Sequence, residues 1–244
     1  MKRSTLDLLR EARRAGRAVV RAVDPSTGEE LLLDPACGQT VLEQAATEAA
    51  RADRSALIEM EGQSWFLEVH NPPLDLRIVG AVHIAQPLAR MAVLAEYQVC
   101  VIDPRSAFAT VERFPGINLS PEWPDEALAK APLSARSALI ALTHDPKLDD
   151  PALMAALRSD CFYIGALGSK RTHRTRLERL ATHGFTGDEL ERIRGPVGLA
   201  IGARSPAEIA ISILAEMTMR LRTDGGRERS AVRATASTGI FPRP

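Results

Sequence analysis

The sequence LRIVGAVHIA at residues 76–85, together with VCVID at residues 99–103, is the strongest indication of the fold of this chain. The apolar residues before Gly80 predict a buried strand, and those after it predict a tight turn that opens a helix. The second apolar run predicts another strand, which ends in Asp103. A glycine turn at a helix N-terminus, followed by an acid at the tip of the next strand roughly 20 residues on, is typical of a dinucleotide-binding βαβ unit.

The glycine turn departs from the dinucleotide pattern at one position. The pattern G-x-G-x-x-G/A has a glycine two residues after Gly80, where this chain has Val82. The middle glycine lets the backbone approach a pyrophosphate closely, so we expect a β-branched side chain there to obstruct ordinary nicotinamide or flavin dinucleotides. The sequence therefore predicts a nucleotide-binding scaffold with a changed ligand.

Composition and charge set broad limits on the function. The chain has 244 residues, of which 45% are hydrophobic, so it can hold one large domain or two small ones. Lys plus Arg equals Asp plus Glu at 31 each, which gives no electrostatic reason to expect nucleic acid as a partner. Three cysteines are too few for a disulfide framework, and no apolar run approaches the ~18–20 residues of a membrane span. We therefore expect a cytoplasmic protein.

The first part of the chain predicts a small α+β N-terminal domain over residues 1–73. Apolar periodicity and turn residues predict helices over 4–15 and 39–51, with strands over 17–23, 29–33, 56–60 and 65–69. Asn71-Pro72-Pro73 ends this domain, because consecutive prolines disfavour both helix and strand pairing.

Strands and helices alternate in the second part, which predicts a Rossmann-like α/β domain over residues 74–222. The expected strands cover 76–81, 99–103, 138–142 and 162–166, and the expected helices cover 83–96, 149–159, 170–183 and 206–221. Such alternation implies a parallel sheet with helices on both faces. Residues 223–244 show no periodicity and predict a flexible C-terminal tail.

Polar residues follow each of the four predicted parallel strands. Ligands of open α/β sheets bind outside the carboxyl ends of the strands, so these loops are the candidate cofactor-binding site. The candidate residues are Gly80, Ala81, Val82, His83, Asp103, Arg105, Thr143, His144, Asp145, Gly168, Ser169, Lys170 and Arg171.

The fourth loop has the clearest chemistry. Ser169 is a plausible N-cap, and the helix that follows offers free N–H groups to an anion. Lys170 and Arg171 add positive charge, and an arginine can hold a phosphate through two hydrogen bonds. The alternative is a capped helix with a solvated basic face.

The other loops leave alternatives open. His144 and Asp145 can contact a ligand or transfer a proton, or Asp145 can form an Asx-type turn into Pro146. His83 can meet a ligand, or it can be an exposed residue of the first helical turn. Asp103 can accept hydrogen bonds from a ribose, and Arg105 can instead bind a phosphate.

Cys37 is a further candidate outside the strand-end loops. It precedes the helix expected over 39–51, and a thiol near a helix N-terminus is favourably placed as a nucleophile or sulfur ligand. Cys100 and Cys161 are most simply small core residues. No Cys/His spacing predicts a zinc site, and no G-x-S-x-G, Walker or H-E-x-x-H motif occurs.

The strand-end loops and two later segments together resemble the xanthine dehydrogenase accessory family (XdhC/CoxI-like proteins). The resemblance covers about residues 75–220 and rests on the order of its motifs. These are VGAVHIA (79–85), VIDPR (101–105), FAT (108–110), RFP (113–115), THD (143–145), YIGALGSKRT (163–172), GPVGLAIGA (195–203) and SPAEIA (205–210).

The resemblance implies a molybdenum cofactor chaperone, an accessory protein rather than a turnover enzyme. Such proteins bind molybdopterin or its cytosine dinucleotide form and deliver it to xanthine dehydrogenase-like or carbon monoxide dehydrogenase-like hydroxylases. A cysteine desulfurase and a second copy of the chain are further candidate partners. The family's N-terminal cysteine segment is echoed by ACGQTVLE at residues 36–43, which includes Cys37.

Two other classes of function stay open. An NAD(P)-dependent oxidoreductase is favoured by the strand–turn–helix with Asp103 and opposed by Val82. A ligand-free interaction subunit of a dehydrogenase is favoured by Val82, which it explains as a lost binding site.

Overall fold

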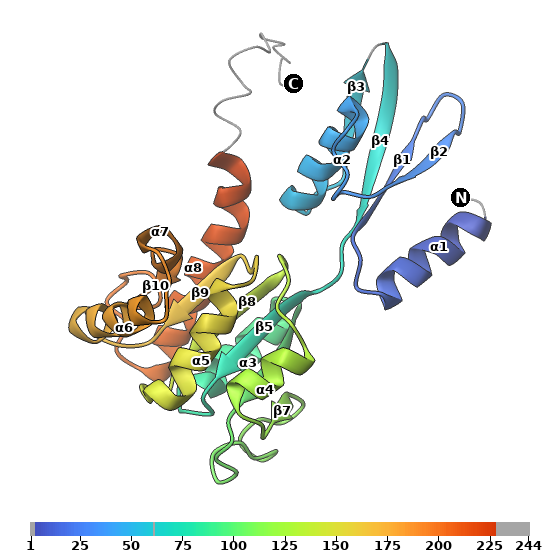
Figure 1. Cartoon of the computed structure of the whole chain (residues 1–244). Helices are drawn as coiled ribbons and strands as arrows, with labels where there is room; N and C mark the ends of the chain where they lie inside the picture. The colour runs from blue at the N-terminus through green and yellow to red at the C-terminus, as the bar shows by residue number, and fades with distance from the viewer. Residues whose placement is uncertain (1–2, 61, 228–244) are drawn as a thin grey trace. The chain divides into compact units, whose positions relative to one another are not determined.

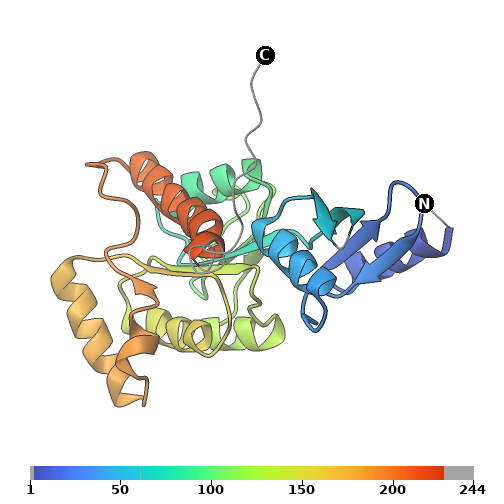
Figure 2. The same ribbon diagram turned by 90° about the horizontal axis from the view of Figure 1, so that it is seen from above.

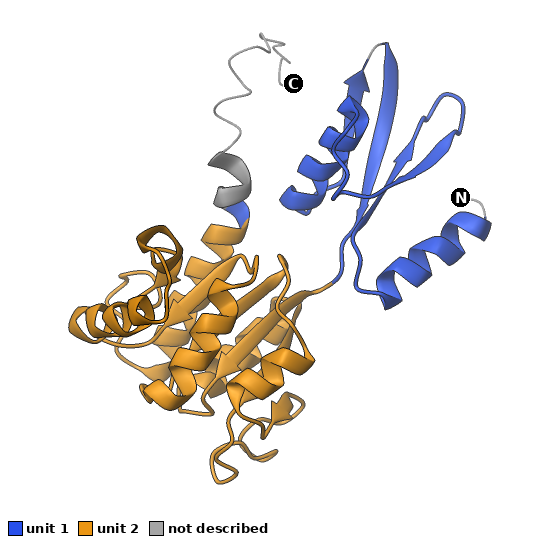
Figure 3. Ribbon diagram, in the orientation of Figure 1, with its two compact units in different colours: residues 1–72, 222–244 blue, residues 73–221 orange. Residues whose placement is uncertain are grey.

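The structure is a computed structural model that describes residues 3–60 and 62–227. The chain divides into two compact units, coloured separately in Figure 3. The N-terminal unit comprises Met1–Pro72 with Arg222–Pro244, and the second unit comprises Pro73–Leu221. No helix among the described residues is long and apolar enough to cross a membrane.

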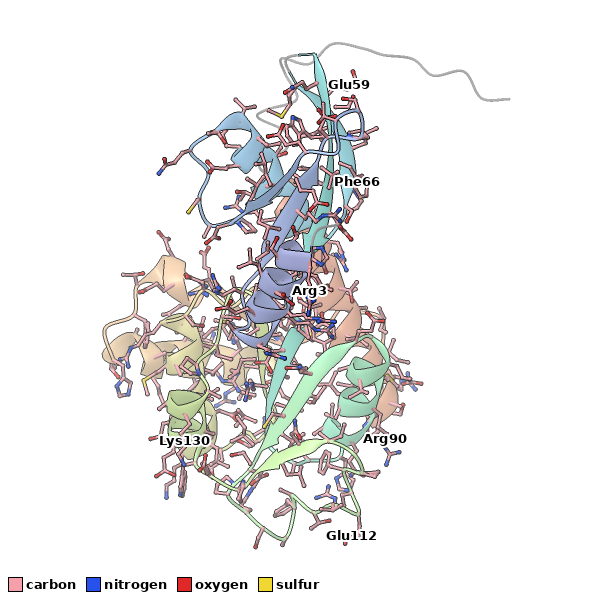
Figure 4. The ribbon with its side chains drawn as sticks, turned by 90° about the vertical axis from the view of Figure 1, so that its right-hand side faces the viewer. Arg3, Glu59, Phe66, Arg90, Glu112 and Lys130 are labelled. Atoms are coloured by element: carbon pink, nitrogen blue, oxygen red, sulfur yellow. The ribbon has the colours of Figure 1, made fainter. Side chains whose placement is uncertain are left out.

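The N-terminal unit is a four-stranded antiparallel sheet with two helices. Its elements are α1 (Arg3–Arg14), β1 (Val19–Val23), β2 (Glu30–Leu33), α2 (Val41–Ala52), β3 (Ala56–Met60) and β4 (Gln63–His70), and the strand order is β2-β1-β4-β3. The alanines of α2 pack on one face of the sheet against Val20, Trp65 and Leu67. Phe66, labelled in Figure 4, and its strand partner Leu57 belong to the opposite face and are exposed.

The second unit contains a six-stranded, wholly parallel sheet in the order β10-β9-β8-β5-β6-β7 (Figure 1). Its strands are β5 (Leu74–Val79), β6 (Tyr97–Ile102), β7 (Asn118–Ser120), β8 (Ser137–Ala141), β9 (Tyr163–Ala166) and β10 (Ile193–Arg194). Counted from β5, this is the 3-2-1-4-5-6 order of dinucleotide-binding folds. The predicted fold class, a Rossmann-like parallel sheet preceded by a small α+β region, is confirmed.

Helices cover both faces of this sheet (Figure 2). One face packs against α3 (Ala85–Leu94) and α8 (Pro206–Arg227), and the other packs against α4 (Pro124–Lys130), α5 (Pro146–Leu157), α6 (Lys170–Thr182) and α7 (Gly187–Leu190). All five residues of β8 are buried, since a parallel strand covered on both faces has no solvent side.

The structure differs from the sequence-based expectation at several elements. The short strands β7 and β10 and the short helices α4 and α7 were not predicted, because elements of a few residues carry little periodicity. Helix α5 begins at Pro146 rather than 149, with Asp145 as its N-cap. Helix α8 continues to Arg227, beyond the expected start of the tail at 223, and residues 228–244 lie outside the described residues.

Candidate functional site

The strand order reverses between β5 and β8, and the loops that leave these two strands meet there. Gly80 follows β5 with φ 104°, and a Cβ at this position would lie 2.5 Å from Thr143 Cγ2. Glycine is therefore required by both the backbone conformation and the close approach of the Thr143 loop. In open α/β sheets this switch point is where ligands bind.

Asp103 joins the loops after β5 and β6. Its side chain is fully buried, and its Oδ2 accepts hydrogen bonds from the Ala81 N–H and from Arg105 Nη2, both at 2.8 Å. Its Oδ1 accepts from Arg105 N at 3.0 Å and from Arg105 Nε at 2.8 Å. Burial alone would raise the pKa of Asp103, but the bonds from Arg105 and Ala81 outweigh burial and lower it.

Arg105 also contacts Phe108, a residue of the same loop after β6. Its guanidinium carbon lies 4.6 Å from the centre of the Phe108 ring, within the range of a cation–π contact. Arg113 lies 5.9 Å from the same ring and donates to the Phe108 carbonyl at 2.6 Å. Glu112, labelled in Figure 4, belongs to the same loop. Arg105 therefore has a fixed position, although 37% of its side chain is exposed.

A second buried carboxylate, Asp149, holds the loop after β8. Its Oδ1 accepts from Thr143 Oγ1 at 2.6 Å, and its Oδ2 accepts from the His144 N–H at 3.1 Å. Arg176 Nη2 lies 3.6 Å from Asp149 Oδ2 and donates to the Leu167 carbonyl at 2.8 Å, so it connects the loops after β8 and β9. Both charged side chains are 2% exposed.

The cost of burying the charges of Asp149 and Arg176 is offset only in part by their interactions. Burial raises the pKa of Asp149, and the bonds from Thr143 and the charge of Arg176 offset only part of that effect. Burial likewise lowers the pKa of Arg176 despite the nearby carboxylates. Arg176 Nε and Nη1 are buried without a hydrogen-bond partner. Neither residue was predicted from the sequence, because Asp149 lies inside a helix and Arg176 belongs to a basic run, residues 170–179, that suggests a local anion site or a solvated face.

The Thr143–Asp145 loop combines a strained and a capping residue. His144 is exposed and has φ 63°, a conformation that residues other than glycine adopt rarely. Asp145 Oδ1 accepts from the Lys147 N–H at 3.0 Å, which is the Asx-type turn that the sequence offered as the alternative for this residue. The loop therefore presents His144, while Asp145 begins α5.

The sequence predicts only that Val82 obstructs a dinucleotide, and the structure shows a packing role for this residue as well. Ala81 is buried, and Val82 is half-buried and packs against the apolar cluster under α3 and α8. Val82 thus contributes to the core as well as occupying the position of the middle glycine. His83 is exposed, and α3 begins at Ala85 after the N-cap residue Ile84, whose side chain forms no capping hydrogen bond.

The turn before α6 has its own cap. Ser169 Oγ accepts from the Thr172 N–H at 3.1 Å, and Gly168 has φ 142°. Lys170 and Arg171 are exposed and form no ion pair within the described part of the chain. The structure therefore contains the features of both alternatives, a capped helix and two available cations.

Cys37 belongs to the N-terminal unit and not to the strand-end loops. It is exposed between β2 and α2, and Thr40 and Glu43 form the capping box of α2. Burial raises the pKa of the thiols of Cys100 and Cys161, as expected of core cysteines. No group of three or more His, Cys, Asp or Glu side chains within 3–60 and 62–227 could hold a metal ion.

The fold defines a Rossmann-like protein, and Gly80, Asp103 and Thr143 lie at the strand-end edge that forms its candidate site. Residues 76–217 match the XdhC Rossmann domain, and the chain belongs to this family. The predicted resemblance is confirmed.

This chain matches a part of each individual relative. The chain is 43% identical over 91 residues to the molybdenum cofactor insertion chaperone PaoD of Escherichia coli K12, which is 37% of this chain and 29% of that protein. It is 31% identical over 153 residues to a probable xanthine dehydrogenase subunit from Bacillus subtilis 168, which is 62% of this chain and 44% of that protein. The chain therefore spans less than half the length of these relatives.

A solved structure shares the fold. The crystal structure of a xanthine dehydrogenase from Bacillus halodurans aligns with a TM-score of 0.69 and 23% identity, over 96% of this chain and 70% of that one. At this identity the likeness supports the fold alone.

Proposed function

We propose that this chain is a cytoplasmic molybdenum cofactor chaperone that delivers the cofactor to a xanthine dehydrogenase-like or carbon monoxide dehydrogenase-like hydroxylase. The observation that carries the proposal is the match of residues 76–217 to the XdhC Rossmann domain, whose relative PaoD is named as an insertion chaperone. In this role the protein binds and hands over its ligand and needs no catalytic residue of its own.

The chemistry of the strand-end loops supports this ligand class. Molybdopterin carries a terminal phosphate, and the edge of the sheet offers Arg105, Lys170 and Arg171 as cations. Helix α3 adds an N-terminus without a side-chain cap, where an anion is favoured. The proposed binding residues are those predicted from the sequence, Gly80, Ala81, Val82, His83, Asp103, Arg105, Thr143, His144, Asp145, Gly168, Ser169, Lys170 and Arg171, with Cys37 from the N-terminal unit.

The two alternative functions are less well supported. An NAD-dependent oxidoreductase needs a strand-end acid that is free to bind a ribose, and all four hydrogen bonds to Asp103 come from the protein itself. Val82, at the position of the middle glycine, opposes NAD and NADP alike. A ligand-free subunit explains Val82 as the sign of a lost site, and the packing of Val82 against the core gives that residue another reason.

The test is a titration of the purified chain with freshly released molybdenum cofactor, in both its molybdopterin and cytosine dinucleotide forms, with NAD and NADP in parallel. We expect saturable, near-stoichiometric binding of a cofactor form and none of NAD or NADP. Binding of NAD or NADP alone would contradict the proposal, and so would partner binding without any small-molecule ligand.

A matched pair of variants tests the cations at α6. Lys170→Ala with Arg171→Ala removes both charges from the first turn, and we expect at least tenfold weaker cofactor binding with the melting temperature unchanged. Arg174→Ala removes an exposed charge one turn further along the same helix and should leave the affinity as it is. Equal affinity in all three proteins would remove Lys170 and Arg171 from the site.

A further inference from the structure

Asp103 stands where a nicotinamide dinucleotide would place its ribose. In such folds an acid at this strand end accepts hydrogen bonds from the ribose hydroxyls. Here the two carboxylate oxygens already accept four hydrogen bonds, three from Arg105 and one from the Ala81 N–H, at 2.8–3.0 Å. A carboxylate has about four acceptor positions, so no position is left for a ligand hydroxyl.

Arg105 binds both oxygens of the carboxylate that would accept from a ribose in a dinucleotide-binding fold. Its Nε and Nη2 form a fork with Asp103, and its guanidinium carbon lies over the Phe108 ring, 4.6 Å from the ring centre. The remaining nitrogen, Nη1, forms no hydrogen bond within the described part of the chain, and 37% of the side chain is exposed. The strand end therefore presents a fixed cation with an N–H to donate, in place of an acid that accepts.

We propose that Arg105 determines ligand specificity. It occupies the hydrogen-bond acceptor positions of Asp103, so that a ribose diol cannot bind there, and it donates its own N–H to a phosphate group of the ligand. The strand end then favours a ligand that places a phosphate there over one that places a ribose diol there. This inference deepens the proposed function and rests on it for the identity of the ligand, because the terminal phosphate of molybdopterin is a group of the required kind.

The experiment measures binding by calorimetry with two simple probes, inorganic pyrophosphate and NAD, on the full chain. The variants are Arg105→Ala, Arg105→Lys, Val82→Gly and the double variant Val82→Gly with Arg105→Ala. Arg113→Ala is the matched control, since Arg113 also lies over Phe108 but makes no bond to Asp103. The molybdenum cofactor is titrated in parallel, and circular dichroism verifies that each variant is folded.

We expect the wild type and Arg113→Ala to bind pyrophosphate and not NAD. Arg105→Ala should bind pyrophosphate at least tenfold more weakly, and Arg105→Lys, which keeps the charge, should recover most of that loss. Only the double variant should bind NAD, because it combines a free Asp103 with the glycine that a dinucleotide requires at position 82.

Three results would overturn the proposal. The first is unchanged pyrophosphate affinity in a folded Arg105→Ala or, if that variant does not fold, equal and tenfold weaker pyrophosphate binding by Arg105→Lys and by the control Arg113→Ala. The second is NAD binding by the single variant Val82→Gly. The third is no NAD binding by the double variant. Failure of the proposed function has a different signature. In that case the cofactor does not bind the wild type, while the Arg105-dependent binding of pyrophosphate persists.

Discussion

On one side of the switch point Asp103 and Arg105 join the loops after β5 and β6, and on the other side Asp149 and Arg176 join the loops after β8 and β9. Asp103 receives short hydrogen bonds at every acceptor position, and its arginine reaches solvent. Asp149 lies 3.6 Å from its arginine, both side chains are buried, and two guanidinium nitrogens have no partner. We call these two Asp–Arg pairs the two clamps, because each joins neighbouring loops. The hydrogen bonds of Asp103 are all made in the first clamp, whereas burial of the charges in the second is offset only in part.

The two clamps are suited to different tasks. A carboxylate with all its bonds satisfied holds its loops at little cost, and its partly exposed arginine is available to a ligand. A buried pair with unmet donors holds its loops at a large desolvation cost, so removing one partner leaves an isolated charge in the core. The first clamp suits recognition, and the second suits rigid positioning of the loop that carries His144.

The largest effect is expected from breaking the buried pair. Asp149→Ala should lower the free energy of unfolding by about 3–5 kcal/mol, because Arg176 would remain buried without its carboxylate. The neighbouring pair Asp150–Arg179 joins the same two helices, but its arginine is 38% exposed, so Arg179→Ala should cost less, about 1–2 kcal/mol. Denaturant unfolding of both variants measures the contrast, and equal losses would refute the distinction between the two pairs.

The next effect concerns Gly80, where the loops from the two sides touch. Gly80→Ala should destabilise the protein by about 2–4 kcal/mol, the sum of about 1 kcal/mol for a positive φ and about 1–3 kcal/mol for the clash with Thr143. Gly184→Ala is the control, because that glycine has φ 89° with nothing within 4 Å of an added Cβ. It should cost only about 1 kcal/mol. Thermal unfolding of the two variants would show no difference if the loops were not in contact.

A smaller effect distinguishes the cap of α6 from the cations beside it. Ser169→Ala should cost about 1 kcal/mol, because the Thr172 N–H loses its acceptor. The double variant at Lys170 and Arg171 should change the unfolding free energy by less than about 0.5 kcal/mol, since both side chains are exposed. A larger loss in the double variant would mean that these cations stabilise the helix and are not reserved for a ligand.

The last prediction is an opposite pH dependence of the two clamps. The lowered pKa of Asp103 contributes stability above the unfolded-state value of about 3.9, and this is lost as the pH falls through the folded-state value. The raised pKa of Asp149 contributes stability below about 3.9, and this is lost as the pH rises through its folded-state value. The wild type should therefore lose stability relative to Asp103→Asn on acidification and gain it relative to Asp149→Asn. Unfolding curves from pH 7 to pH 3 measure both differences, and slopes of the same sign would contradict the assignment.

Much of the fold could be predicted because its signals are local. The apolar residues at 76, 78 and 79, the apolar run at 138–141 and the glycine at 80 are enough to predict buried parallel strands and a tight turn. Asp103 could be placed at the end of a parallel strand, because the end of an apolar run can be seen in the sequence. The burial of Arg176 could not be predicted, because the sequence of a basic run does not show which of its cations will face the core.

Periodicity and turn chemistry within short windows were enough to establish the parallel α/β architecture, the glycine turn at position 80 and the strand-end loops that form the candidate site. The folded chain then selected which side chains meet at that site. It paired Asp103 with Arg105 rather than leaving it free, buried Arg176 against Asp149, and packed Val82 into the core. The contact of Arg176 with Asp149 and the packing of Val82 join residues that are distant in the chain. Asp103 and Arg105 are only two residues apart, and the fold decides their pairing by burying Asp103 beside the Ala81 N–H. A local sequence pattern specifies neither the distant contacts nor the burial.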